Sequence, residues 1–287
     1  MRQRLVGAAL AAMLGIGGCA STAPPVLRLQ RPVVLLGEVH DHPQQHALRA
    51  AAFRAHVEAG ARPALLMEQF DRQHQAAIDL ATSPGSTPPT AAAVIAAGQG
   101  GAGWKWDFYR PFIETALEYR LPIVAANVGR DEARRVMREG LVATGFNPDV
   151  PAEVSGSLVR AIVASHCGMV DEATAGRMAL AQVARDQQMA RVVTAHAARG
   201  VVLLAGNGHV RNDVGVPRWL DVATRARSES IGVLEIGDDT TAFDRRVFTP
   251  PHPRPDPCEA MRRPGASPAS TTQTNPASAV SAPRTAP

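Results

Sequence analysis

The strongest constraint on the fold comes from two stretches that share one pattern, an apolar run followed by Gly-x-x-His. Val33–Leu36 is a run of four apolar residues, and a glycine and a burst of acids and imidazoles follow it at once. Val201–Ala205 repeats the design and leads into Gly206-Asn-Gly-His209. Short apolar runs that stop at glycine predict buried strands. Ligands bind at the carboxyl ends of strands in open α/β sheets, so His40 and His209 converge on one pocket if the two strands are neighbours.

The rest of the chain alternates between strand and helix patterns. A helix pattern at Pro43–Ala59 follows the first Gly-x-x-His segment, and other helix patterns separate the remaining apolar runs. Strands separated by helices form parallel sheets, so the sequence predicts an α/β fold: a mostly parallel central sheet flanked by helices. Consecutive helix patterns between Asp131 and Arg199 predict a helical insertion or lid. Further strands are expected at Pro63–Met67, Leu121–Ala125, Ser230–Ile236 and Arg245–Phe248.

The N-terminus has the pattern of an export signal. Arg2 and Arg4 precede an apolar run from Leu5 to Ile16, and Gly17-Gly18-Cys19 follows. The run is too short to span a bilayer. It resembles a bacterial lipobox, which predicts a signal peptide at residues 1–18, lipid such as palmitate on Cys19, and a tether at residues 19–30. The chain is then a lipid-anchored protein of the bacterial cell envelope, at the outer membrane. An ordinary secretory signal is the alternative.

Composition changes again near the C-terminus. Residues 31–249 suit one domain, whereas residues 250–287 are rich in Pro, Ala, Ser and Thr and predict a disordered tail. One of the two remaining cysteines, Cys258, lies in that tail, so a disulfide is not expected, and Cys167 is interpreted as a small buried apolar residue. The formal net charge of +4 resides largely in the signal and the tail, and no basic stripe is present, which disfavours nucleic-acid binding.

Polar side chains at the predicted strand ends offer one kind of chemistry. Glu38, His40, Glu68 and His209 could hold Mn²⁺, Co²⁺ or Zn²⁺ with an open position for water, as in a metal-dependent hydrolase. The alternative interpretation is structural: the two imidazoles brace their glycine turns, and Glu68 caps the next helix.

An aromatic segment offers another kind of chemistry. Trp104-Lys-Trp-Asp-Phe-Tyr109 follows a glycine-rich break, and a tyrosinate can ligate haem iron, which makes Tyr109 a candidate axial ligand. His166 is a second candidate, with Met169 and Trp106 as apolar contacts. Structural alternatives remain open: Trp106 and Tyr109 are spaced as core anchors of a helix, and His166 could cap a helix C-terminus.

Several motifs, in order, resemble the ChaN family of haem-binding uptake lipoproteins, and the resemblance extends from Val33 to Ile236. The family belongs to a superfamily that includes Tiki and TraB proteins, where paired Gly-x-x-His motifs accompany metal-dependent proteolysis. The motifs are Leu36-Gly-Glu-Val-His-Asp-His-Pro-x-x-His46, Met67-Glu-Gln-Phe70, Trp106-Asp-Phe-Tyr-Arg-Pro111, Ala125-Ala-Asn127, His166-Cys-Gly-Met169, Arg185-Asp-x-x-Met-Ala190, and Ala205-Gly-Asn-Gly-His-Val-Arg211 with Gly215-Val-Pro217.

The resemblance implies a non-enzymatic, membrane-anchored protein that binds haem between the two subunits of a homodimer and serves the haem and iron transport machinery. It makes Tyr109 the leading iron ligand and Arg211 a partner for the haem propionates. A hydrolase that uses two Gly-x-x-His motifs, with Glu38 as general base, is the alternative. The residues assigned to the haem pocket are Tyr109, His166, Met169, Trp106, His40, His209 and Arg211.

Overall fold

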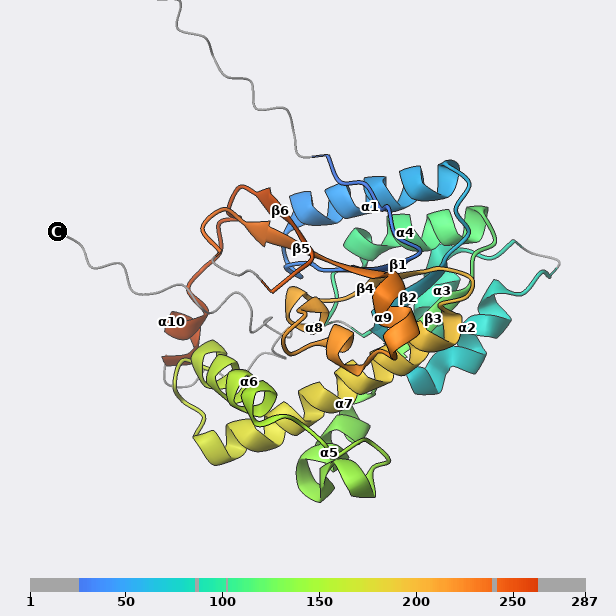
Figure 1. Cartoon of the computed structure of the whole chain (residues 1–287). Coiled ribbons are helices and arrows are strands. Elements are labelled where there is room, and N and C mark those ends of the chain that lie inside the picture. Colours follow the sequence, from blue (N-terminus) through green and yellow to red (C-terminus); the bar gives the residue numbers. More distant parts are fainter. Residues whose placement is uncertain (1–25, 86–87, 102, 239–241, 263–287) are drawn as a thin grey trace, which may run out of the picture.

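The computed structural model describes residues 26–262 except 86–87, 102 and 239–241. Within that part of the chain, six strands form one sheet in the order β3-β2-β4-β1-β5-β6, and every neighbouring pair is parallel. This confirms the predicted α/β fold (Figure 1). The strands are β1 (Val33–Leu36), β2 (Ala64–Asp71), β3 (Ile123–Asn127), β4 (Val201–Leu204), β5 (Ser228–Glu235) and β6 (Arg245–Thr249).

Helices cover both faces of the sheet because its central strands are apolar on both sides. Phe53 of α1 and Phe112 of α4 pack with Val34 and Leu65 on one face. Met189 of α7 packs on the other face. The helices are α1 (Pro43–Glu58), α2 (Gln75–Thr82), α3 (Ala91–Ala97), α4 (Trp106–Glu118), α5 (Arg130–Ala143), α6 (Ala152–Ser165), α7 (Glu172–His196), α8 (Asn207–Val210), α9 (Val222–Arg227) and α10 (Pro257–Arg262), with 3₁₀ turns at Arg72–His74 and Val216–Trp219.

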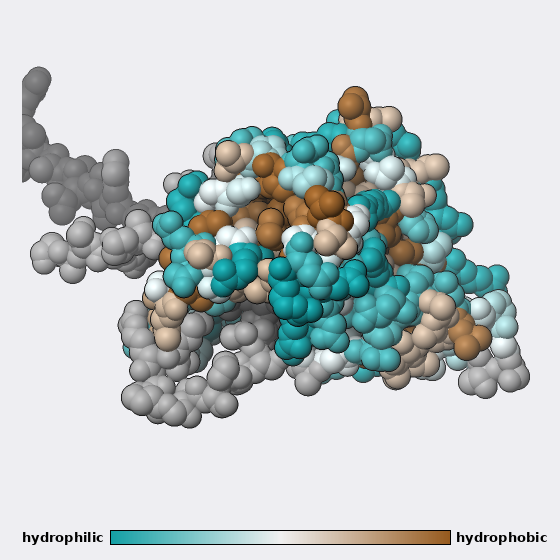
Figure 2. All heavy atoms as spheres, turned by 90° about the horizontal axis from the view of Figure 1, so that it is seen from below, coloured by the Kyte–Doolittle hydropathy of each residue, from teal (hydrophilic) through white to brown (hydrophobic). Residues whose placement is uncertain are grey.

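The predicted helical insertion is present as α5, α6 and the first half of α7. These helices bury their own apolar cluster, which includes Val136, Leu158 and Ala179, and the second half of α7 continues onto the sheet. Figure 1 shows them together on one side of the molecule. Figure 2 views the molecule from that side and shows a hydrophobic area in the upper middle of the face, directly beside a large hydrophilic area.

The two strand and Gly-x-x-His segments are neighbours, as the sequence analysis required. β1 and β4 pair in register from Val33 opposite Val201 to Leu36 opposite Leu204, so their carboxyl ends emerge together. The turns then interlock: the backbone N–H of Asn207 donates to the carbonyl of Glu38 at 2.9 Å. Gly37 is needed for this approach, because a Cβ there would lie 2.2 Å from Asn207 Oδ1.

None of the described helices is both long and apolar enough to cross a bilayer. The predicted signal peptide, Cys19 and most of the tether lie outside the described residues. So do residues 263–287 of the predicted tail.

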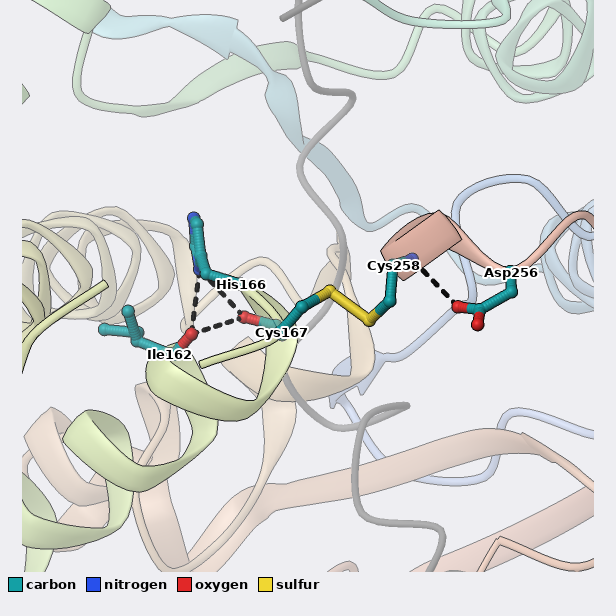
Figure 3. Close-up of a disulfide and its surroundings, with 6 residues drawn as sticks. Ile162, His166, Cys167, Asp256 and Cys258 are labelled. Atoms are coloured by element: carbon teal, nitrogen blue, oxygen red, sulfur yellow. Dashed lines mark hydrogen bonds between the residues drawn. A yellow bond between two sulfur atoms is a disulfide. The ribbon is translucent and has the colours of Figure 1, made fainter. Parts of the chain in front are cut away.

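Residues 250–262 depart from the predicted disordered tail. Cys258 forms a disulfide with Cys167, at a sequence separation of 91 residues, so the expectation of no disulfide is wrong (Figure 3). Arg254 forms ion pairs with Asp41 and Glu235. A proline-rich segment cannot build a core of its own, but it stays in place where a covalent bond and paired charges hold it. We refer to residues 250–258 as the strap.

Candidate functional site

A fully buried carboxylate, Glu38, lies directly beyond β1 and gathers side chains from two helices. Arg49 of α1 donates through Nη1 to Oε2, and the hydroxyl of Tyr109 in α4 donates to Oε1. His40 places Nδ1 at 2.7 Å from Oε1. Arg49 is also fully buried, and its Nη2 donates to the carbonyl of Leu36 at 3.0 Å. The ion pair therefore joins the end of β1 to both helices.

The charges in this cluster shift its pKa values in different directions. Burial raises the pKa of Glu38, but Arg49, His46 and His40 more than offset it and hold the pKa well below its ordinary value. Burial, together with the charge of Glu38, raises the pKa of Tyr109 well above its ordinary value. Burial lowers the pKa of His40, but Glu38 and Glu68 outweigh it and the net shift is upward. Glu38 is therefore the anion of the cluster, and Tyr109 is a neutral phenol.

His46 belongs to the same cluster and is kept neutral. Its ring stacks on Phe108 with centroids 4.5 Å apart, and its Nε2 lies 3.1 Å from the carbonyl oxygen of His40. Burial, with a further contribution from Arg49, lowers its pKa to about 4. Arg49 has only N–H donors, so Nδ1 of His46 acts as acceptor and Nε2–H donates to the carbonyl.

A second imidazole–carboxylate pair lies beyond β4. Nδ1 of His209 is 2.6 Å from Oδ1 of Asp186 in α7, and its Nε2 is 3.5 Å from Oε1 of Glu68 in β2. The N–H of Gly206 donates to Oε2 of Glu68 at 2.8 Å. Burial raises the pKa of Asp186 to about 6, while Glu68 and Asp186 outweigh burial and raise the pKa of His209.

The two pairs occupy one electrostatic environment. Glu68 raises the pKa of both His40 and His209, and the charge of His209 acts to lower that of His40. In each pair Nδ1 is turned to a carboxylate, so Nε2 is the atom turned away from it. His40 is 8% exposed, and the His209 side chain is 12% exposed. Two oriented imidazoles thus meet at the carboxyl edge of the sheet, at the position predicted from sequence.

Gln69, next to Glu68 in β2, is a buried amide without a partner. It is 5% exposed, and neither Nε2 nor Oε1 has a hydrogen-bond partner in the structure. Buried polar groups are normally satisfied, so this amide is an exception in the described part of the chain.

Of the other residues assigned from sequence, Trp106 borders the cluster, and His166, Met169 and Arg211 have local contacts. Trp106 stacks on Phe70 with centroids 5.2 Å apart and meets the ring of Tyr109 edge-on at 6.0 Å. His166 follows the last turn of α6 and places Nδ1 2.8 Å from the carbonyl of Ile162, which is the capping alternative. Met169, 62% exposed, is in the same turn. Arg211 pairs with Asp213, its Nε 2.8 Å from Oδ1.

Tyr109 does belong to the cluster, but not as a group open to a ligand. It is fully buried, and its hydroxyl donates to Glu38.

The alternative metal site gains no support from the geometry. Among the described residues, no three or more His, Cys, Asp and Glu side chains are grouped so that they could hold a metal ion.

Three site residues were missed by the sequence analysis. Arg49 lies one helical turn after His46, but arginine in an amphipathic pattern is normally solvent-facing. Asp186 lies in the Arg185-Asp-x-x-Met-Ala190 motif, and that motif was the available signal for it. Gln69 follows Glu68 directly, and nothing in its local sequence marks it as unpartnered.

Comparison with known proteins agrees with the fold and names a family. A family model described as haem-binding uptake, Tiki superfamily, ChaN, matches residues 28–220. The structure of ChaN of Campylobacter jejuni with cofacially bound haem superposes with a TM-score of 0.59 at 22% identity, covering 71% of this chain and 81% of that chain. An erythromycin esterase, EreC, gives a TM-score of 0.42 at 13% identity over 72% of this chain and 71% of its own, too slight a likeness for inference. No curated protein matches the chain.

The Arg49–Glu38 pair makes the first prediction. Arg49→Met leaves a buried carboxylate unpaired, so we expect the free energy of unfolding to fall by about 3–5 kcal/mol in urea titrations. Arg54→Met is the matched control: that side chain is 40% exposed and paired with Glu118, and its loss should cost at most about 1 kcal/mol. Equal costs for the two variants would contradict the assigned role of Arg49.

His46 makes the second prediction. Its pKa is about 4 in the folded chain against an ordinary value of 6.5, so the unfolded chain binds more protons between these values. Its contribution to stability is therefore lost as pH falls through this window. In His46→Gln, the loss of stability from pH 6.5 to pH 4 should be smaller than in the wild type by about 1–3 kcal/mol.

Denaturant titrations at half-unit pH steps measure this difference, and His74→Gln, outside the cluster, is the control. Asp186 contributes with the opposite sign, because its pKa is raised to about 6 in the folded chain. Its contribution is lost as pH rises, so comparison with the wild type, rather than the absolute slope, isolates His46. An unchanged pH dependence in His46→Gln would show that this imidazole is not neutral in the folded chain.

Proposed function

Because the chain belongs to the ChaN family of haem-binding uptake proteins in the Tiki superfamily, we propose that it binds haem at the carboxyl edge of the sheet. The observation that carries the proposal is the pair of oriented imidazoles, His40 and His209, inside the segment that the family model matches. Bound haem supplies an iron centre that takes an axial ligand from the protein.

The donor set fits such a group. Imidazole is a common axial ligand of haem iron. Metal-binding histidines usually direct their other ring nitrogen to a carboxylate, which fixes the tautomer and the ring orientation. His209 has this arrangement with Asp186, and His40 has it with Glu38. Of the two, His209 has the more exposed side chain, 12% against 6%, and we propose it as the axial ligand.

Tyr109 is the less suitable candidate. Ligation by tyrosinate requires loss of the phenol proton, and the pKa of Tyr109 is raised well above its ordinary value by burial and by Glu38. Its hydroxyl is also already bonded to Glu38. We propose that Tyr109 fixes Glu38, which in turn orients His40, rather than binding iron itself.

The surroundings of the imidazoles suit a flat apolar ligand. Trp104 meets His40 edge-on with ring centroids 5.0 Å apart, and Phe108 stacks on His46. Arg211 and the exposed Met169 stay proposals for contacts at the edge of the ligand.

We also propose that the chain is exported, lipid-anchored through Cys19 in the outer membrane, and active in haem or iron uptake, with haem bound between two subunits. The signal-like N-terminus supports export. The Cys167–Cys258 disulfide supports it independently, because disulfides persist mainly in oxidising compartments outside the cytosol.

Titration with ferric haem tests the ligand assignment. We expect a saturable Soret band of the histidine type in the wild type, its loss in His209→Ala, and an affinity about 10–100-fold weaker in Asp186→Asn, which removes the orienting carboxylate. Tyr109→Phe and the control His74→Ala should keep the wild-type spectrum. A spectrum that changes in Tyr109→Phe and not in His209→Ala would assign the iron to Tyr109 and overturn this account.

A second candidate function is acid–base hydrolysis, favoured by the same two carboxylate-oriented imidazoles. One imidazole can accept a proton from water as it attacks an ester carbonyl while the other protonates the leaving alkoxide. If this occurs, the haem-free chain should hydrolyse p-nitrophenyl acetate, with at least a tenfold loss of rate in both His40→Ala and His209→Ala. A chelator separates a metal-dependent reaction from a metal-independent one. Equal rates in the wild type and both variants would exclude it for this ester.

A further inference from the structure

The strap connects two parts of the chain that otherwise belong to different layers. It leaves β6 at the edge of the sheet and reaches the turn between α6 and α7 in the helical insertion, where Cys258 is bonded to Cys167 (Figure 3). His166 precedes Cys167 in that turn, and Met169 follows two residues later. The strap is thus tied covalently at one end and continuous with the sheet at the other.

On the sheet side, the strap is anchored to the residues that directly follow His40. Arg254 binds Asp41 through two contacts of 3.0 and 3.1 Å, and Glu235 at the end of β5 through contacts of 2.7 and 3.1 Å. Nε2 of His42 lies 2.9 Å from the carbonyl oxygen of Pro250, and the N–H of His252 donates to Glu235 at 3.2 Å. Movement of the strap therefore acts on Asp41 and His42, next to His40.

These anchors differ in strength. The Arg254 side chain is 31% exposed, and ion pairs of this exposure hold a segment only weakly on their own. The disulfide does not depend on solvent or salt, and both cysteines are half-buried rather than enclosed. The covalent bond is therefore the element that decides whether the strap stays in place.

We propose that the strap is a redox-operated latch: the Cys167–Cys258 bond holds the α6–α7 turn to the segment after His40, and its reduction frees that segment and opens access to His40. The reductant is a dithiol. One of its thiolates attacks one sulfur of the disulfide, which breaks the Cys167–Cys258 bond, releases the other cysteine as a thiolate and leaves a mixed disulfide. The second thiol of the reductant then attacks the mixed disulfide and releases the remaining cysteine as a thiolate, and both cysteine thiolates take up a proton. Two electrons and two protons pass to the chain as two thiols, and the dithiol becomes a disulfide.

Chemical labelling of the histidines tests the latch without haem, so its failure is separate from failure of the haem proposal. The full chain is folded oxidised, divided into samples with and without dithiothreitol, and treated with diethyl pyrocarbonate. Peptide mass spectrometry then gives the labelling rates of His40 and His209. We expect the rate for His40 to rise at least threefold on reduction and more than the rate for His209, while the rate for His74, far from the strap in sequence, stays unchanged.

Matched variants separate the latch from other effects of the reductant. Cys258→Ser should show the faster rate at His40 without dithiothreitol and no further increase with it. Arg254→Gln, with the disulfide intact, should raise the rate at His40 less than reduction does. Hydrogen exchange of residues 39–46 and 250–258 gives an independent readout of the same opening, and reduction should accelerate it.

Three results would overturn the proposal. The first is free thiols at both Cys167 and Cys258 in the chain folded under oxidising conditions. The second is equal labelling of His40 before and after reduction, including no labelling in either state. The third is an increase on reduction that also occurs in Cys258→Ser. Because reduction is applied to chain that is already folded, none of these outcomes depends on whether the serine variant folds.

Discussion

The ion pair between Glu38 and Arg49 is the interaction on which the site depends. Both groups are fully buried, so each must satisfy its charge inside the protein, and the surrounding elements are arranged accordingly. Arg49 binds the end of β1 twice, through Glu38 and through the carbonyl of Leu36, while Tyr109 brings α4 to the same carboxylate. A buried ion pair of this kind contributes little net stability, but it holds the elements that it joins in one arrangement. It fixes where β1 ends, and therefore where His40 lies.

The second half of the site is built on a different principle. Asp186 and Glu68 approach His209, the buried Arg185 acts on both carboxylates through its charge, and burial still raises the pKa of Asp186. The two imidazoles therefore face one strongly acidic carboxylate, Glu38, and one weakly acidic one, Asp186. This asymmetry lies in the carboxylates, since the pKa of His40 and that of His209 are both raised. It is compatible with an iron ligand beside a hydrogen-bonding neighbour, and equally with an acid beside a base.

The local sequence pattern was sufficient to predict the buried strands, but not to predict which buried side chains pair with Glu38. The repeated strand and Gly-x-x-His pattern predicted two buried strands and a shared pocket if they were neighbours. The structure meets that condition, because β1 pairs with β4 and Gly37 permits the interlocked turns. The role of Arg49 was not predicted, because a local pattern cannot show that an arginine in a helix has a carboxylate partner 11 residues earlier, at the end of a strand. Tyr109 was identified as functional for its chemistry, yet only the packing of α4 on α1 shows that its hydroxyl is already bonded.

The strap was mispredicted for a related reason: the two contacts that hold it are distant in sequence. Composition describes what a segment can bury, and a proline-rich segment buries little, but composition cannot register a bond to a cysteine 91 residues away or an ion pair 213 residues away. Those two contacts are also of different kinds: the ion pair forms with folding, whereas the disulfide needs an oxidising environment. A chain that keeps its signal-like N-terminus inside the cytosol would fold with the ion pair alone. Under the proposal of export, the compartment in which the chain folds therefore determines how the strap beside His40 is held. In an oxidising compartment the disulfide holds it, and in the cytosol only the Arg254 ion pairs do.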